Sequence, residues 1–337
     1  MRVVVLGAGG AHKTEASIVR AVRELGHACR LVNVVGWSRG AGPLAPRAIR
    51  YLADAFEPDF VLLTRHAILA GERTIRSLLR GRGAAFWYFD LQPRPPALAL
   101  VAERMYTTYL GQVERYRAAG VPHVQFLPQA VDPTRDFPVS AVDPAFRCDA
   151  SFVGSGQYAH RHAVLRAVAA VSHLQVRGPG WAGVPDDLPV AGGPVHGRRL
   201  RQVISAAAIS LGANSHPEQD AERASASNRM WKVLGCGGFY LGPYVQDIEW
   251  LAVGGRHCAW YRSAADAADQ TRHYLAQHDE RRRIADAGRA HSLRHHTYAR
   301  RLELLLAGRA YEPAGASDQP VIAELEHPDP GQPLDRP

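Results

Sequence analysis

Two cations and a glycine turn stand close together between Ser227 and Leu241. The pattern predicts a helix that carries Arg229 and Lys232, followed by a tight Gly-Cys-Gly-Gly turn and a short apolar strand. Helix N-termini, fixed cations and glycine turns are features with which proteins bind phosphate groups. The alternative is an ordinary helix–turn–strand connection, because glycine marks such turns in any α/β protein.

A first glycine loop, Gly7–His12, directly follows an apolar strand at the N-terminus. Its start resembles the dinucleotide-binding fingerprint, but its sixth position is His12, and the second strand ends at Asn33-Val34 without the acid that would hold a ribose. The pattern therefore argues against NAD or FAD, although Gly9 and Gly10 could still line a ligand cleft. Imidazoles titrate near neutrality, so His12 is a candidate general base, with a capping or solvent-facing histidine as the alternative.

Two further glycine loops follow predicted strands in the second half of the chain. In one of them, Gly154 and Ser155 offer unhindered backbone amides, and Arg161 adds a cation. In the other, Gly178 precedes Trp181, whose indole could stack on a base or a sugar. Open α/β sheets bind ligands at the carboxyl ends of their strands, where these loops lie. The alternatives are plain strand–helix turns and a tryptophan that only covers the sheet edge.

Short apolar runs alternate with amphipathic helical stretches along both halves of the chain. This alternation predicts an α/β protein with two Rossmann-like domains facing a cleft, each built on a parallel sheet with both faces covered. The expected strands are Val3–Leu6, Arg30–Val34, Phe60–Thr64, Ala84–Phe89, Val124–Leu127, Ala150–Val153, Leu174–Arg177, Ile209–Gly212, Phe239–Leu241 and His257–Tyr261. The expected helices are Glu15–Leu25, Pro46–Ala55, Glu72–Arg80, Gly111–Ala119, His160–Val171, Arg198–Ala207, Asn228–Leu234, Ala264–Gln277 and Arg281–Leu306.

The predicted domains span residues 1–140 and 148–310. Between them, Asp132–Arg147 contains three prolines and no clear periodicity, which is typical of a connection. The tail at 313–337 is rich in proline and acids with little apolar content, so we expect it to be disordered and to take no part in the site.

Composition excludes several classes of protein. The chain has 337 residues, 46% of them hydrophobic and 21% charged, as expected for a globular protein large enough for two domains. The net charge of +8 favours acidic or phosphorylated partners, but the scattered arginines carry no nucleic-acid motif, which argues against nucleic acid. The four cysteines lack metal or disulfide spacing, and no stretch reaches the ~20 apolar residues of a membrane span. We therefore expect a cytoplasmic protein without a transmembrane segment.

Five short segments from Leu127 onward carry a family resemblance through their order. They are Leu127–Pro133 (LPQAVDP), Asp149–Ser155 (DASFVGS), Arg177–Trp181 (RGPGW), the stretch from Asn228-Arg229 to Gly237–Phe239, and His296–Arg301 (HTYARR). Each segment alone is a weak signal. In this order they resemble the glycosyltransferase domain of CgeB-type (spore-maturation-protein-like) proteins, which are similar to GT-B glycosyltransferases grouped with family 4.

The resemblance implies a glycosyltransferase whose C-terminal domain binds a nucleotide-sugar while the N-terminal domain binds an acceptor that the sequence does not identify. The family usually has Glu, an acceptor for ribose hydroxyls, where this chain has Lys232, and lysine cannot accept a hydrogen bond. Asp247 or Glu249 could take the ribose, the donor could differ, Lys232 could meet a phosphate, or activity could be lost. The residues expected at the donor site are Gly154, Ser155, Arg161, Gly178, Trp181, Asn228, Arg229, Lys232, Gly237 and Glu249.

The chemistry of sugar transfer sets the remaining expectations. Departure of a nucleoside diphosphate builds negative charge, which fixed cations and amides stabilise. No metal-ligand cluster is visible in the sequence, so we expect neither a metal nor another cofactor. His12 and Asp90, each after a strand of the first domain, are candidate bases for the acceptor hydroxyl, although Asp90 could equally cap a helix or turn. A retaining reaction would need no such base.

Two other functions fit the same sequence. A sugar-nucleotide epimerase would use the same two-domain fold, and it would not release nucleotide in response to an acceptor. A catalytically silent nucleotide-binding protein would bind the nucleotide without turnover, and the departure at Lys232 is the feature that points to it.

Overall fold

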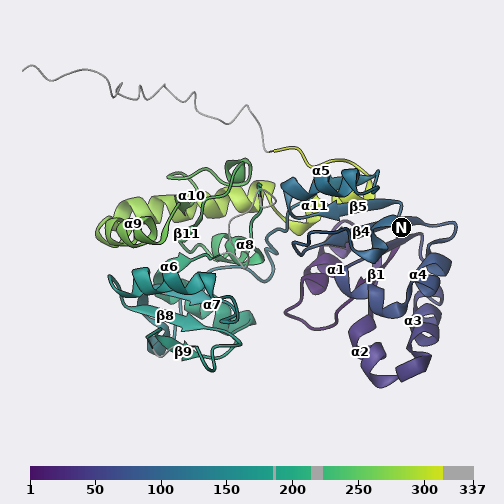
Figure 1. The fold of residues 1–337 in the computed structure, drawn as a ribbon, viewed down its shortest axis with the longest axis horizontal. Coiled ribbons are helices and arrows are strands. Elements are labelled where there is room, and N and C mark those ends of the chain that lie inside the picture. The colour runs from purple at the N-terminus through teal and green to yellow at the C-terminus, as the bar shows by residue number, and fades with distance from the viewer. Residues whose placement is uncertain (185–186, 214–222, 314–337) are drawn as a thin grey trace, which may run out of the picture.

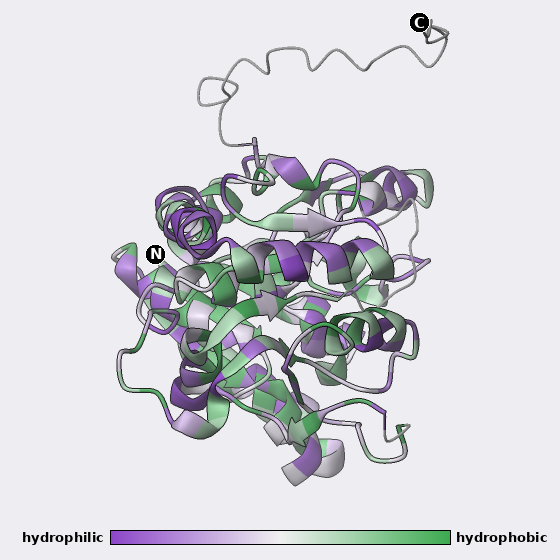
Figure 2. Ribbon diagram, turned by 90° about the vertical axis from the view of Figure 1, so that its left-hand side faces the viewer, coloured by the Kyte–Doolittle hydropathy of each residue, from purple (hydrophilic) through white to green (hydrophobic). Residues whose placement is uncertain are grey.

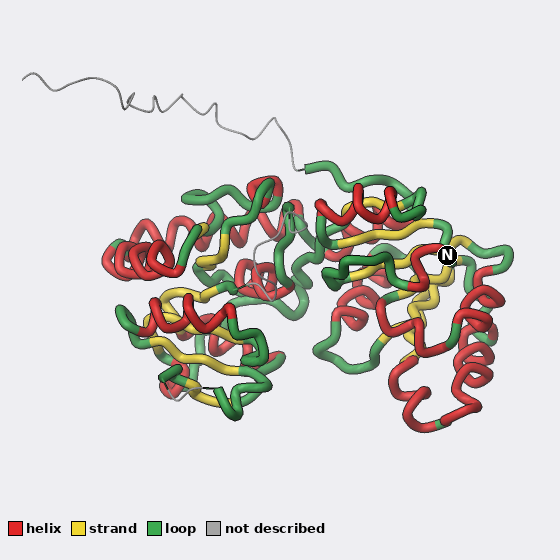
Figure 3. Tube along the Cα trace, viewed as in Figure 1, coloured by secondary structure: helices red, strands yellow, loops and turns green. Residues whose placement is uncertain are grey.

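The computed structural model describes residues 1–184, 187–213 and 223–313, which form two lobes (Figures 1 and 3). Each lobe is built on a six-stranded parallel sheet with helices packed on it. The predicted α/β class with two Rossmann-like sheets is therefore confirmed. All but the first residue of the tail predicted to be disordered, 313–337, lies outside the described residues.

The first sheet has the strand order β2-β1-β3-β4-β5-β6. Its strands are β1 (Arg2–Gly7), β2 (Ala28–Asn33), β3 (Phe60–Leu63), β4 (Gly83–Tyr88), β5 (Arg104–Thr107) and β6 (Val124–Phe126). Its helices are α1 (Thr14–Glu24), α2 (Val34–Gly40), α3 (Ala45–Asp54), α4 (Glu72–Leu79) and α5 (Leu110–Ala118). Strand β1, between β2 and β3, is buried after its first residue, as its continuous apolar run predicts. In Figure 2, hydrophilic colour marks several helices on the outside of the molecule.

The second sheet has the order β12-β11-β10-β7-β8-β9. Its strands are β7 (Cys148–Val153), β8 (Leu174–Arg177), β9 (Val190–Gly192), β10 (Ala207–Leu211), β11 (Tyr240–Pro243) and β12 (Ala259–Tyr261). The remaining helices are α6 (His160–Ala169), α7 (Gly197–Ala206), α8 (Asn228–Gly235), α9 (Ala264–Ala276), α10 (His278–His295) and α11 (Tyr298–Leu306). The predicted connection, Asp132–Arg147, lies between the last strand of the first sheet and the first strand of the second.

Three elements were not predicted from the sequence: β5, α2 and β9. Strand β5 has only four residues and a charged one at its start, yet it lies between β4 and β6, so Met105 and Tyr106 are buried. Helix α2 follows β2 without a loop, and the Asn33 side chain caps it by accepting a hydrogen bond from the Gly36 amide at 3.0 Å.

The single C-terminal helix predicted over Arg281–Leu306 is wrong, because the chain breaks at His296–Thr297. Thr297 caps α11 with its hydroxyl and forms a β-bridge with Val131, which keeps these residues out of a continuous helix. Helix α11 then packs on α1 in the first lobe, as Figure 1 shows, and its Tyr298 ring meets Trp87 edge-on. The predicted return of the chain to the first domain is confirmed, so the second predicted domain, 148–310, includes a helix that completes the first lobe.

None of the helices among the described residues is both long and apolar enough to cross a membrane.

Buried histidines gather where α10 gives way to α11. His257 stacks on His291 with ring centroids 4.0 Å apart, and the Nε2 atoms of His291 and His296 are 3.1 Å apart. His296 also stacks on Trp231 of α8. Burial, reinforced by neighbouring basic groups, lowers the pKa of His257 to about 3 and holds the pKa of His296 well below its ordinary value. Both rings are therefore neutral in the folded protein at pH 7.

This cluster predicts acid sensitivity. In the unfolded chain each histidine titrates near 6.5, so below that pH the unfolded state binds more protons than the folded state. Stability should be complete above pH 6.5 and fall as the pH drops toward 3, by up to about 1.4 kcal/mol per pH unit for each histidine. Thermal unfolding between pH 7.5 and 5 measures this. His257→Asn should reduce the slope, whereas His278→Asn at an exposed position should leave it unchanged. A melting temperature that is flat across this range would contradict the prediction.

Candidate functional site

A pocket of about 300 Å³ lies between the lobes at the carboxyl ends of strands in the second sheet. Its walls come from the ends of β7, β8 and β10, from residues 194–196 before α7, and from α7 and α8, and the first lobe contributes His12. This is where open α/β sheets bind ligands, and the volume is at the small end of the range for ligand pockets.

Closely packed glycines form the floor of this pocket. A Cβ added to Gly154 would overlap the Arg229 guanidinium and lie 2.7 Å from the Phe152 ring. Gly178, at φ +144°, would drive a Cβ into the carbonyl oxygen of Gly154. The glycines are therefore required by the close approach of two loops. The Gly154 amide donates to the Arg177 carbonyl at 2.8 Å, so that amide is not available to a phosphate, contrary to our expectation.

Arg229 places a positive charge at this floor. Its Nε donates to the Val153 carbonyl at 2.6 Å and its Nη1 to the Ala213 carbonyl at 3.3 Å, while the guanidinium lies over the Phe152 ring at 4.4 Å. Burial lowers the pKa of Arg229, yet a guanidinium stays charged at neutral pH. Within the described part of the chain no carboxylate pairs with it. The site thus holds a desolvated cation beside Gly154, as predicted.

Arg161 and Trp181 lie behind the floor and do not line the pocket. The Arg161 Nη1 donates to the Ser155 carbonyl at 2.9 Å, and burial together with the charge of Arg229 lowers the pKa of Arg161 to about 10. The Trp181 indole donates to the Gly154 carbonyl at 2.9 Å and packs edge-on against Phe152. Trp181 therefore holds the loop and is too buried to stack on a ligand, and Arg161 supports the loop from beneath.

Besides Arg229, helix α8 brings two more predicted residues to the pocket, and it contacts the first lobe. The Asn228 amide lies 3.5 Å from the Thr14 hydroxyl of α1. The Lys232 Nζ lies 3.7 Å from an Asp136 carboxylate oxygen, and the lysine side chain remains 27% exposed toward the pocket. Burial raises the pKa of Asp136, and Lys232 opposes that shift. Lys232 is thus a pocket cation that already has a nearby carboxylate.

His12 reaches the mouth of the pocket from the first lobe. Its ring stacks on His196, the residue before α7, with centroids 4.4 Å apart and planes at 17°. Burial lowers the pKa of His196, and His12 adds to the effect. Gly9 and Gly10 do not line this pocket; the Gly9 amide donates to the Asn33 side chain at 2.9 Å and so fixes the loop that presents His12.

Four predicted residues lie elsewhere. Asp90 pairs with Arg65 at 2.6 Å on the first lobe, and Ser155 turns away from the pocket that Gly154 lines. Glu249 accepts from the Gly254 amide at 3.3 Å. Gly237 comes after the C-terminal end of α8, whereas Arg229 lies in its first turn. The two ends of this eight-residue helix are about 12 Å apart. The Gly-Cys-Gly-Gly turn and the helix N-terminus therefore line different hollows.

Sequence reasoning missed the wall formed by α7 and the residues before it. His196 and Leu200 line the pocket from this segment, and the hydroxyl of Ser210 in β10 is buried there without a hydrogen-bond partner in the described structure. The signal available in the sequence was a histidine two residues before the predicted start of the helix at Arg198. No group of three or more His, Cys, Asp or Glu side chains that could hold a metal is found in the described ranges.

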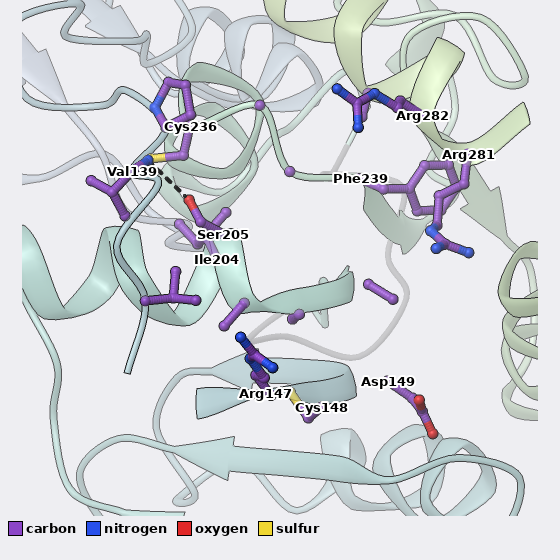
Figure 4. A pocket seen from close by; sticks show the side chains of 18 of the residues that line it. Val139, Arg147, Cys148, Asp149, Ile204, Ser205, Cys236, Phe239, Arg281 and Arg282 are labelled. Atoms are coloured by element: carbon purple, nitrogen blue, oxygen red, sulfur yellow. Dashed lines mark hydrogen bonds between the residues drawn. The ribbon is translucent and has the colours of Figure 1, made fainter. Parts of the chain in front are cut away.

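A larger hollow, about 1050 Å³, lies at the opposite end of the second sheet (Figure 4). It opens at the amino ends of β7 and β10, where Cys148 and Asp149 face Arg281 and Arg282 of α10. Gly237 belongs to this hollow. Open parallel sheets bind their ligands at the carboxyl ends of their strands. We therefore choose the candidate site by its place on the sheet and not by its volume, which selects the smaller pocket.

Comparisons with known proteins identify the fold. Residues 160–307 match the model of the family described as "Glycosyl transferase-like", and no curated protein sequence matches the chain. The fold is similar to that of Anabaena HepE in complex with UDP and glucose, at 12% identity and a TM-score of 0.63 over 91% of this chain and 98% of that one. It is also similar to the sucrose-phosphate synthase of Thermosynechococcus elongatus, at 12% identity and a TM-score of 0.64 over 91% and 98% of the two chains. An alpha-glucosyltransferase in complex with UDP gives 10% identity and a TM-score of 0.66 over 91% and 99%. The chain thus has the GT-B fold, and residues 160–307 lie in a glycosyltransferase-like region.

The glycine floor gives a direct test of the pocket. If this pocket is a phosphate site, Gly154→Ala should lower the affinity for the probe UDP at least tenfold, because the new methyl group displaces the Arg229 guanidinium. Isothermal titration with UDP measures this. Gly193→Ala, where a Cβ meets no atom within 4 Å, is the matched control and should bind UDP like the wild type. Equal UDP affinity of both variants would show that the floor is not a phosphate site.

Proposed function

We propose that the protein transfers a sugar from a nucleotide-sugar donor to an acceptor, with the nucleotide held in the 300 Å³ pocket of the second lobe. The observation that carries this proposal is the desolvated Arg229 guanidinium at the glycine floor. Its bonds go to backbone carbonyls, so its charge is uncompensated in the described structure and is available to an anion. The GT-B fold and the family match over residues 160–307 support the same conclusion.

The geometry accounts for stabilisation of the leaving group. As the bond from the sugar to the diphosphate breaks, negative charge grows on the phosphate oxygens. Arg229 lies fixed at the floor and Lys232 on the wall, both in a partly desolvated site where charge interactions are stronger than in water. These cations take the part that a divalent metal plays elsewhere, so we propose transfer without a metal or another cofactor.

His12 is the residue that we propose as a base if the reaction inverts the sugar configuration. It lies at the mouth of the pocket, on the side of the first lobe, where an acceptor hydroxyl would approach. Asp90 is no longer a candidate, because it pairs with Arg65 and does not line the pocket. In a retaining reaction no such base is needed, and His12 would then only bind the substrate.

Lys232 takes the phosphate in this proposal, and among the described residues no acid lines the pocket to replace the ribose-binding glutamate. Asp247 is bound by Arg223 at 2.6 Å, and neither Asp247 nor Glu249 lines the pocket. Ser210, whose buried hydroxyl has no partner in the described structure, is the pocket group that could accept a hydrogen bond from the nucleoside.

We further propose that the chain is of the CgeB type and acts in the cytoplasm. Support comes from contacts among the five segments that carry the resemblance. Trp181 and Arg229 bind the carbonyls of Gly154 and Val153, and Arg301 binds the carbonyl of Pro128 at 3.1 Å. The segments therefore form two connected clusters instead of five scattered matches.

A nucleotide panel tests the function itself. Thermal shift with nucleoside diphosphates and nucleotide-sugars should reveal a ligand that raises the melting temperature, because a ligand specific for the folded state stabilises it. Nucleotide release that requires an acceptor identifies a transferase. Interconversion of the donor sugar without release would identify an epimerase, and binding without turnover over a broad acceptor panel would identify a silent binding protein.

Lys232 variants test the proposed contact with phosphate. Lys232→Met keeps the aliphatic stem but removes the charge, so the transfer rate should fall by about 10²–10³ while Lys232→Arg retains much of it. Lys232→Glu should be worse than Met, because it adds a negative charge facing both the phosphate and Asp136. Transfer rates, UDP affinity and melting temperatures should be compared. Unchanged kinetics with a lowered melting temperature would show that Lys232 only neutralises Asp136.

A further inference from the structure

A second, smaller cavity adjoins the donor pocket. It measures about 40 Å³ and shares the side chains of His12, His196, Leu200 and Lys232 with that pocket. At roughly 10–15 Å³ for each enclosed water, it holds about three waters, which is room for one small group but not for a whole sugar ring.

Cations from both lobes surround this cavity. Its charged lining residues are Lys13, Arg20, Arg135, Arg201, Lys232 and Asp136. Asp136 interacts with Lys232, and Arg20 is bound by Asp132 at 2.8 Å. For the other three cations, no carboxylate partner is present in the described structure.

Arg201 shows most clearly that the lining is incomplete. Its Nη1 donates to the Arg135 carbonyl at 3.0 Å, and its guanidinium lies over the Phe137 ring at 4.0 Å. Its Nε is buried and makes no hydrogen bond in the described structure. A buried donor without a partner is costly, and an oxyanion in the cavity would satisfy it.

The donor alone does not account for this charge. A nucleotide-sugar carries one negative charge on each phosphate of its diphosphate, and Arg229 and Lys232 in the donor pocket match these charges. Lys13, Arg135 and Arg201 line the cavity and not the donor pocket, and Asp136 can offset only one of these three charges once Lys232 meets a phosphate. A net positive charge therefore remains at the cavity. Arginine forks and a lysine together suit a phosphate or a carboxylate.

We propose that the acceptor is an acidic molecule whose phosphate or carboxylate group binds in this cavity. The proposal rests on the glycosyl transfer proposed above. In that reaction the acceptor hydroxyl oxygen forms a bond to the anomeric carbon of the sugar. At the same time the bond between this carbon and the diphosphate oxygen breaks. The hydroxyl proton goes to His12 or to the departing phosphate, and the nucleoside diphosphate leaves with the electron pair. The anion anchored between Lys13 and Arg201 holds the hydroxyl in place from both lobes.

Binding of inorganic phosphate to the protein saturated with UDP tests the cavity, because UDP then fills the donor pocket. Phosphate should raise the melting temperature further in the wild type, at constant ionic strength set with chloride. Arg201→Gln should weaken this phosphate affinity about tenfold or more, since it removes a charged donor. Lys13→Gln on an exposed loop should act in the same direction without a risk to folding, and Arg199→Gln on α7, outside the cavity lining, is the matched control. A parallel titration with acetate separates a carboxylate site from a phosphate site.

The outcomes separate the two proposals. If UDP does not bind to the wild type, the proposed function fails first. If UDP binds but neither phosphate nor acetate adds stability, or if Arg201→Gln and Arg199→Gln respond alike, the acidic acceptor is wrong. A tenfold loss of UDP affinity in Arg201→Gln would assign the cations to the donor and overturn the inference as well. Turnover of hexose 6-phosphates or hexuronates in preference to the uncharged hexoses, abolished in Arg201→Gln, would support it.

Discussion

One buried arginine, Arg301, connects the two places where the chain passes between the lobes. Its side chain is 1% exposed, and it donates to the carbonyls of Pro128 at 3.1 Å and His295 at 3.2 Å, with Nη2 2.6 Å from the His296 Nδ1. Removing it would leave buried acceptors without partners, which costs more than the hydrogen bonds themselves contribute. Because Pro128 belongs to the outgoing passage and His295 to the returning one, this guanidinium sets how the sheets face each other.

The shape of the candidate pocket depends on how the two lobes are held together. Helix α8 carries Arg229 toward the second sheet, while its other face touches the first lobe and the two passages through Asn228, Trp231 and Lys232. A shift of the lobes would therefore move the helix that carries Arg229. The glycine floor is too closely packed to adjust to such a shift, because the two loops that meet at Gly154 are in contact through their backbones.

Sequence patterns predicted the sheets well because buried parallel strands are continuous apolar runs, and they placed Gly154 and Arg229 correctly at one strand end. Local signals misjudged residues whose partners are distant in sequence. A tryptophan after a strand can stack on a ligand, which is why Trp181 was predicted at the site. Tertiary packing instead places it under the Gly154 loop, and the local sequence does not show this. Asp90 meets Arg65 only because neighbouring strands bring them together. His196 was missed because its significance depends on His12, far away in the chain.

The return of α11 to the first lobe has a consequence for biosynthesis. The first sheet leaves the ribosome early, but Tyr298, Leu302 and Leu305, which pack against its buried face, are made much later. About 170 residues separate β6 from α11, which corresponds to roughly 10–35 s of translation at ~5–20 residues per second. During that interval an apolar surface on the nascent lobe is uncovered, so the first half of the chain is the part most in need of chaperone protection.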